Sequence, residues 1–199
     1  VILVYPTITG TSFSREAIRS LGAVPRNGGT LIATQVLGGG LEEVFGYSHA
    51  VEASRQPEIR WNRAHPLMEQ MTDPAEWVMK LNGKEENSIG TYGYVRARGA
   101  IGSYPDGLVA VTAKDYDRGH AYAIGIDLGA LLLKGYNNRT DGFTTSFDNQ
   151  FDPTLDVWLR LLKGMYQAGE PNAVTIGMIT EITEKPASDR SRAMRSVSR

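Results

Sequence analysis

The loop at positions 135–139 carries the residue types best suited to hold a hydroxyl-rich ligand. It follows His120–Leu128, the strongest predicted strand, and open α/β sheets often bind ligands beyond the carboxyl ends of their strands. An aromatic stacking face and several hydrogen-bond donors suit a sugar. The same residues also fit a polar turn, because Asn tolerates left-handed backbone geometry. Both interpretations stay open, and the residues of this candidate site are Tyr136, Asn137, Asn138 and Arg139.

A triple glycine at positions 38–40 is a candidate anion site, because it precedes a predicted short helix at Leu41–Phe45. Helix N-termini present free N–H groups that can cradle phosphate. A P-loop also needs a Lys and a Ser or Thr at fixed spacing, whereas Glu42 and Glu43 follow here. Two carboxylates suit the helix dipole but repel phosphate. We interpret the glycines as a flexible lead into a helix.

Metal ligands would have to come from histidines or acids. The three histidines, His49, His65 and His120, do not stand at a metal-binding spacing such as HxH or HExxH. We expect His65 in a turn before Pro66, and His120 as a packed strand residue that alternates with Tyr122. A run of acids that could suggest calcium lacks the spacing of an EF-hand loop; it comprises Asp141, Asp148, Asp152 and Asp156. We predict no metal and no cofactor.

The sequence contains no recognisable catalytic motif. The chain has no Cys, which removes thiol nucleophiles, disulfides and thiolate metal sites. It also lacks a nucleophile elbow of the GxSxG type. Paired carboxylates of a glycosidase can come from distant parts of a fold, and no pattern here locates them. We assign no catalytic residue.

Composition bounds the class of protein. The chain has 199 residues, of which 41% are hydrophobic and 22% charged, as in an ordinary globular domain. A net charge of -1 argues against a general nucleic-acid binder. No run of about 18 apolar residues is present, so we predict no membrane span.

The predicted elements define the fold class. We predict a strand at Val1–Pro6, a helix capped by Ser14 that ends near Leu21, and a second strand at Thr30–Thr34. This strand–helix–strand order is typical of a parallel sheet with a helical crossover. Strands at Leu108–Ala113 and His120–Leu128 predict a hairpin. A further helix begins at Asp152-Pro153 and ends at Gly169. Its predicted apolar face comprises Val157, Trp158, Leu161, Leu162 and Met165. We predict a three-layer α/β sandwich of flavodoxin-like type, with a mostly parallel sheet and an antiparallel hairpin at one edge.

The predicted domain covers residues 1–180. The chain opens inside a buried-strand pattern, Val1–Tyr5, without an initiator Met, so we expect it to be truncated at the N-terminus. Residues 181–199 are polar, with several Arg and Ser, and are predicted to form a disordered tail or linker.

Four segments together resemble the class I glutamine amidotransferase-like fold: the predicted helix that ends at Leu21, Asn27–Ala33, Leu41–Gly46 and above all Asp117–Gly129. In particular, they resemble non-catalytic versions of this fold, as in the middle domain of certain β-galactosidases and in domains that precede some polysaccharide deacetylases. The likeness covers roughly Val1 to Ala168, with a poor match in its middle third.

The chain departs from active members of that family. They carry a nucleophilic Cys on a strand-to-helix elbow and a His and an acid after the closing strand, where this chain has Asp127-Leu128-Gly129. Thiol amidotransferase chemistry is therefore excluded. A polysaccharide deacetylase site would need a cluster of His and Asp metal ligands, which this sequence does not contain.

The resemblance implies a non-catalytic accessory or scaffolding domain of a multidomain carbohydrate-active protein, whose parent is a polysaccharide deacetylase or a glycoside hydrolase. The implied partners are neighbouring domains, a glycan and a second copy of the chain. The alternatives are a glycan-acting hydrolase with unlocated carboxylates and a carbohydrate-binding module. The compartment stays open, and the cell envelope or the extracellular space is favoured only if the parent processes polysaccharides.

Overall fold

A computed structural model describes residues 1–5, 7–53, 56–81, 90–128 and 153–169. Val1–Gly169 forms one compact unit. The predicted domain boundary at residue 180 and the predicted tail at 181–199 lie outside the described residues and stay predictions. No helix in the described ranges is both long and apolar enough to cross a membrane.

The first helix, α1 (Arg15–Arg26), begins where the sequence predicts and ends later. The Ala17 N–H donates to Ser14 Oγ at 3.1 Å, which confirms the predicted N-cap. The predicted end near Leu21 was wrong. Pro25 lies in the last turn, where its missing N–H removes a single helix hydrogen bond and does not stop the helix.

The predicted strand–helix–strand unit is confirmed, since β1 (Ile2–Val4) pairs in parallel with β2 (Thr30–Thr34) on either side of α1. Two 3-10 helices begin at Pro66 and Pro74, and each is capped by the side chain of the residue before the proline, His65 or Asp73. The remaining elements are α2 (Glu42–Phe45), β3 (His49–Glu52), β4 (Glu58–Trp61), η1 (Pro66–Gln70), η2 (Pro74–Trp77), β5 (Val78–Lys80), β6 (Tyr92–Val95), β7 (Ala100–Ser103), β8 (Val109–Tyr116), β9 (Gly119–Ile124) and α4 (Pro153–Gly169).

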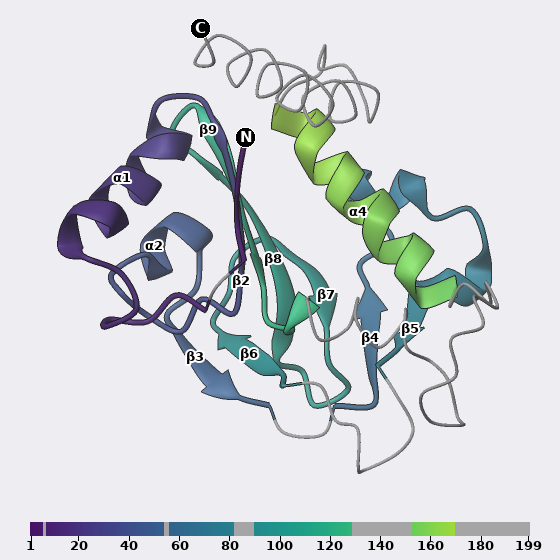
Figure 1. The fold of residues 1–199 in the computed structure, drawn as a ribbon. Coiled ribbons are helices and arrows are strands. Elements are labelled where there is room, and N and C mark those ends of the chain that lie inside the picture. The colour runs from purple at the N-terminus through teal and green to yellow at the C-terminus, as the bar shows by residue number, and fades with distance from the viewer. Residues whose placement is uncertain (6, 54–55, 82–89, 129–152, 170–199) are drawn as a thin grey trace, which may run out of the picture. The chain divides into compact units, whose positions relative to one another are not determined.

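The described strands form one mixed, open sheet in the order β1-β2-β9-β8-β7-β4-β5, and β6 joins β3 to β8 (Figure 1). The α/β class is confirmed. The parallel part comprises β1, β2 and β9, while every other pairing between described strands is antiparallel. The predicted mainly parallel character therefore holds only for that part.

The predicted hairpin, β8–β9, exists but does not lie at an edge of the sheet. β9 has β2 on one side and β8 on the other, so it is a central strand. Its side chains from Ala121 to Ile124 are all buried. A strand that is apolar on both faces gains most from the middle of a sheet, where both faces are covered. The expected edge position was wrong for this reason.

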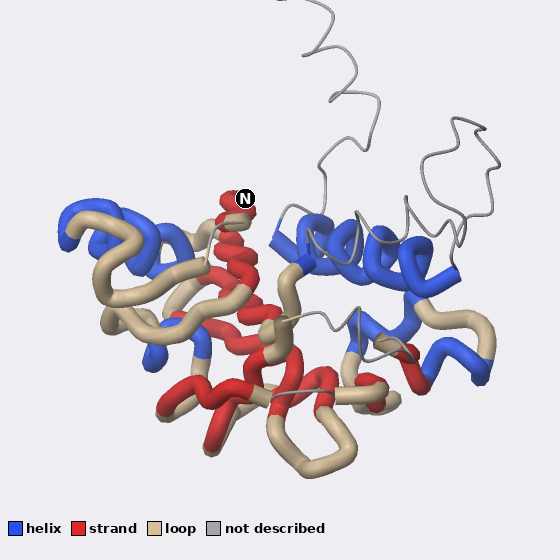
Figure 2. Tube along the Cα trace, turned by 60° about the horizontal axis from the view of Figure 1, so that its bottom comes forward, coloured by secondary structure: helices blue, strands red, loops and turns tan. Residues whose placement is uncertain are grey.

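Helices cover both faces of the central strands. Leu31 and Ala33 of β2 belong to the apolar cluster that includes residues of α2 and has α1 side chains packed against it, whereas Ile32 belongs to the cluster that includes α4. Strand β9 alternates in the same way, and Figure 2 shows helices on either side of the strands. The predicted apolar face of α4 is confirmed, because its buried residues are Val157, Trp158, Leu161 and Met165.

Candidate functional site

The predicted carbohydrate loop, Tyr136, Asn137, Asn138 and Arg139, lies outside the described residues and stays a prediction. The same holds for Asp141, Asp148 and Asp152, while Asp156 falls within α4. Among the described residues, no three His, Asp or Glu side chains converge in a way that could hold a metal ion.

Two of the histidines have the structural positions that the sequence predicts. His65 caps η1, with Nδ1 accepting from the Leu67 N–H at 3.2 Å, and burial lowers its pKa. His120 lies on β9, where its ring stacks near that of Tyr122, with centroids 6.4 Å apart. Its Nδ1 lies 2.8 Å from Asp115 Oδ1 on the neighbouring strand.

The Asp115–His120 pair continues across the sheet to Thr30, which stands opposite His120 on β2. A hydroxyl, an imidazole and a carboxylate side by side are the groups of a catalytic site in which a hydroxyl nucleophile is activated by a general base. Thr30 is fully buried, however, and no hydrogen bond joins its Oγ1 to a described partner. A substrate has no access to this hydroxyl, so we interpret the row as packing. The sequence could not indicate it, because it depends on strand register.

The largest pKa shifts fall on buried tyrosines and have structural causes. Burial raises the pKa of Tyr47, Tyr94 and Tyr104 well above the usual range. The Tyr47 hydroxyl donates to Val36 O at 2.9 Å and its ring stacks on Tyr94 at 4.5 Å. The Tyr104 hydroxyl donates to a backbone carbonyl as well. Perturbed groups often mark active sites, but these phenols hold backbone groups inside the core.

A surface hollow of about 380 Å³ lies beside the start of α1. Two segments form it: the loop after β1 with the first turns of α1 that it leads into, and Gly39 of the triple glycine. The residues that line it are Gly10, Phe13, Arg15, Ile18, Arg19 and Gly39. Gly39 therefore lines a hollow as well as belonging to the lead into α2, which the sequence interpretation missed because the other lining residues are about twenty or more positions away in the chain.

Local chemistry shapes this hollow. Thr9 Oγ1 accepts from the N–H groups of Thr11 and Ser12, and the Thr9 N–H donates to Ser12 Oγ at 2.7 Å, so the loop is braced by its own hydroxyls. Gly39 has φ +83°, and a Cβ there would lie 3.3 Å from both Ile18 Cδ1 and the Thr9 carbonyl oxygen. Only glycine fits this position without strain.

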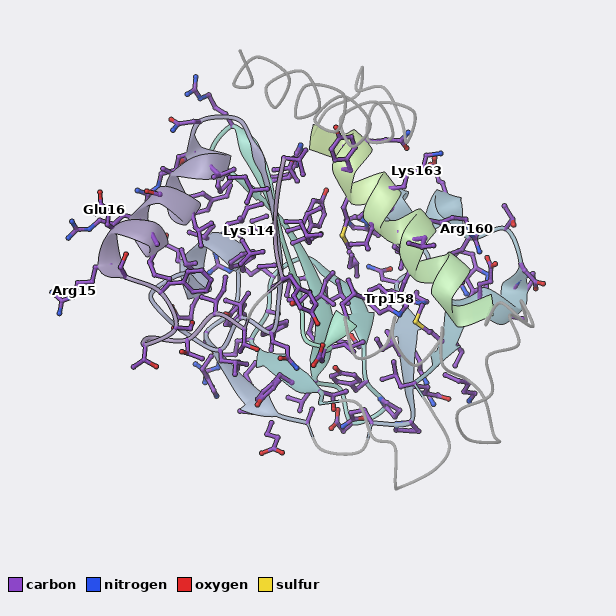
Figure 3. The ribbon with its side chains drawn as sticks, in the orientation of Figure 1. Arg15, Glu16, Lys114, Trp158, Arg160 and Lys163 are labelled. Carbon is purple, nitrogen blue, oxygen red and sulfur yellow. The ribbon has the colours of Figure 1, made fainter. Side chains whose placement is uncertain are left out.

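Arg15 and Arg19 give the hollow its charge. Both side chains are exposed, and neither forms a hydrogen bond or an ion pair with a described residue; Arg15 projects outward from α1 (Figure 3). Arg26, at the other end of the same helix, is engaged: it donates to the Tyr116 hydroxyl at 3.0 Å and lies over that ring. The hollow is thus bordered by two unpaired guanidinium groups.

The edge strand β1 forms an exposed apolar surface. Ile2 is 42% exposed, and Leu3 and Tyr5 are each 53% exposed. Among the described strands, β1 pairs only with β2, so its other edge has backbone groups without strand partners. We refer to Val1, Ile2, Leu3 and Tyr5 as the β1 edge.

No protein-family model matches the chain, and a comparison with curated proteins also gives no match. Among solved structures, the chain is similar to the cold-adapted β-galactosidase from Rahnella sp. R3, with 18% identity and a TM-score of 0.39 over 74% of this chain and 20% of that one. It is also similar to Gan42B, a GH42 β-galactosidase, with 21% identity and a TM-score of 0.36 over 65% of this chain and 19% of that one. A catalytic mutant of Gan42B from G. stearothermophilus gives 21% identity and a TM-score of 0.34.

The chain spans about a fifth of the length of each of these β-galactosidases. β-Galactosidases are among the proteins named by the sequence resemblance. The amidotransferase-like part of that resemblance and the deacetylase context stay predictions.

Proposed function

We propose that this chain is a non-catalytic accessory domain that packs against another domain of a longer carbohydrate-active protein through its β1 edge. The observation that carries the proposal is the set of large apolar side chains left exposed on an edge strand. On this proposal, the fold is a three-layer, flavodoxin-like version of the class I glutamine amidotransferase-like domain, and the parent is a glycoside hydrolase or a polysaccharide deacetylase.

Edge strands of proteins are usually protected against pairing with other chains by charged residues, bulges or proline. The other two strand edges among the described residues follow this rule. Strand β5 ends in Lys80, which forms an ion pair with Glu58, and β3 ends in the exposed Glu52. Strand β1 has no charged side chain, and an unprotected apolar edge of this kind is typical of a surface that another polypeptide covers.

The energy available at the β1 edge is sufficient for a contact within one chain. Covering the exposed half of a Leu or Ile side chain contributes about 1 kcal/mol. Leu3, Ile2 and Tyr5 together would then contribute about 3 kcal/mol, before backbone hydrogen bonds are counted. That is modest for two free proteins but ample for neighbouring domains, whose linker supplies a high effective concentration.

The absence of cysteine supports the non-catalytic part of the proposal, because the nucleophile of active amidotransferases has no counterpart in this chain. The buried Thr30 offers no substitute. Turnover assays of the purified chain on a panel of glycans and acetylated glycans should give no product. Hydrolysis or deacetylation by the pure chain would overturn the non-catalytic assignment.

The docking role is tested by Leu3→Lys, with Val78→Lys as the matched control. Val78 is also an exposed apolar residue on an edge strand, with 37% of its surface exposed. In the isolated chain, both variants should unfold within about 0.5 kcal/mol of the wild type. In the full-length parent protein, Leu3→Lys should weaken domain docking by about 2 kcal/mol or more, because it buries an unpaired ammonium group, while Val78→Lys should not.

Equal effects of the two variants in the parent would contradict the proposal. Self-association of the isolated chain that Leu3→Lys abolishes would instead assign the β1 edge to a second copy.

A further inference from the structure

We propose that the hollow beside the start of α1 binds a small phosphorylated molecule, with the phosphate between Arg15 and Arg19 and the rest of the ligand against Phe13. This site is separate from the β1 edge and does not depend on the proposed docking role. It also differs from the predicted loop at 136–139.

The placement of the two arginines is electrostatically unfavourable in the absence of an anion. Arg15 and Arg19 are four residues apart, so their like charges lie on one face of α1. Arg15 is also in the first turn of the helix, where the helix dipole disfavours cations. Glu16 stands in the same turn but forms no ion pair with either of them. A bound dianion would attract both guanidinium groups and the N-terminus of the helix, and would offset the repulsion between the two arginines.

The walls of the hollow define what fits beside the anion. Gly10 leaves open space, since a Cβ there would meet no atom within 4 Å, whereas Gly39 lies close to Ile18 and to the backbone of Thr9. Phe13 and Ile18 are half-buried and present apolar surface. A volume of about 380 Å³ suits a ligand of monosaccharide size. An aromatic side chain beside planar guanidinium donors matches the C–H face and the charged group of a sugar phosphate.

The loop supplies neutral groups that complement the charge. Thr9, Thr11 and Ser12 bring three hydroxyls next to Gly10, and the backbone N–H groups of Arg15 and Glu16 donate to no described acceptor. Neither Glu16 nor Glu42, the acidic residues near this region, lines the hollow. A patch of only two arginines on a chain of net charge -1 favours a small phosphate ester over a nucleic acid.

The test is a titration of the 199-residue chain with three probes: inorganic phosphate, glucose 6-phosphate and glucose. Binding is followed by calorimetry at low ionic strength, and by amide resonances of Gly10, Arg15, Arg19 and Gly39. Glucose 6-phosphate should bind, inorganic phosphate should bind at the same residues at least tenfold more weakly, and glucose should not bind. Inorganic phosphate that binds as tightly as the ester would show that Phe13 contributes nothing, which would overturn the assignment of a phosphate ester.

The double variant Arg15→Gln/Arg19→Gln should weaken glucose 6-phosphate binding at least tenfold. The control is Arg98→Gln, which removes one positive charge from an exposed position outside the hollow and should bind as the wild type does. The double variant should keep the thermal midpoint of the ligand-free wild type or exceed it, because it removes repulsion between like charges. Absence of binding by the wild type, equal binding by the double variant, or equal binding of glucose would each overturn the proposal.

Discussion

Substitution of Glu76 is expected to loosen the packing of α4, because this one carboxylate has two structural tasks. Its Oε2 accepts the N–H groups of Thr72 and Asp73 at 3.0 and 3.3 Å and completes the capping box of η2. Both carboxylate oxygens also accept hydrogen bonds from the Arg160 guanidinium of α4, labelled in Figure 3. Glu76 and Arg160 are mostly buried, with 20% and 26% of their side-chain surface exposed.

The magnitude follows from these contacts. Loss of a cap costs about 1 kcal/mol, and loss of a bidentate, mostly buried ion pair costs about 1 kcal/mol more. Glu76→Ala should therefore lower the free energy of unfolding by about 2 kcal/mol, which corresponds to a fall of about 4–8 °C in Tm. Glu76→Gln keeps an oxygen acceptor for the cap and should lose about half as much.

The effect should also depend on pH. Arg160 beside Glu76 holds the pKa of that carboxyl below its usual range, and the backbone hydrogen bonds from Asp73 and Thr72 lower it further. Because folding lowers this pKa, the stabilisation is fully present above the unfolded value of about 4.3 and is lost as pH falls through the folded value.

Urea unfolding of the wild type, both Glu76 variants and the control Glu69→Gln, at pH 7 and at pH 3, measures these contributions. Glu69 is an exposed acid in η1 and its substitution should change little. The reasoning is refuted if Glu76→Ala unfolds within about 0.5 kcal/mol of the wild type at pH 7. It is also refuted if the difference between the wild type and Glu76→Gln is as large at pH 3 as at pH 7.

Two further predictions concern a glycine just before β7 and the histidine that caps η1. Gly99→Ala should destabilise the fold by about 3 kcal/mol or more, since Gly99 has φ +72° and a Cβ would lie 1.8 Å from the Ala113 carbonyl oxygen. The control Gly107→Ala, at φ +88° in open space, should cost only about 1–2 kcal/mol. Equal losses of the two variants in urea unfolding would contradict the predicted clash at Gly99. Burial lowers the pKa of His65, so an NMR titration should place its midpoint below the usual value of about 6.5. The neutral form then contributes stability above that pH which is lost as pH falls through the folded pKa, and a midpoint at or above 6.5 would contradict the burial of the ring.

The sequence predicts those parts of the fold that depend on local patterns. The Ser14 cap, the hairpin turn before Gly119 and the apolar face of α4 each rest on residues close together in the chain, and each is present in the structure. The position of the hairpin in the sheet could not be predicted in this way. It depends on the pairing of β9 with β2, which are about ninety residues apart. Strands β3, β4 and β5 were also missed, because each is only three or four residues long, too short for the alternation in β4 to stand out.

The candidate sites show the same limit. The hollow beside α1 combines Gly10, Arg15 and Gly39, which no motif connects, and its unpaired arginines become evident only when their neighbours are known. The exposure of Leu3 could not be inferred either, because a short run of apolar residues predicts a buried strand. The predicted loop at 136–139 rests on residue chemistry alone and remains to be tested.

Hydrogen–deuterium exchange at the β1 edge is the most direct test of the accessory-domain proposal. The measurement compares peptides that cover Val1–Tyr5 in the isolated 199-residue chain and in the full-length parent protein. Because the free edge of β1 and its apolar side chains would be covered by another domain, these amides should exchange at least tenfold more slowly in the parent. Peptides of β5, a strand edge protected by charge, should exchange at the same rate in both and serve as the internal control. Equal exchange of Val1–Tyr5 in the two proteins would show that nothing covers the β1 edge and would contradict the proposed function.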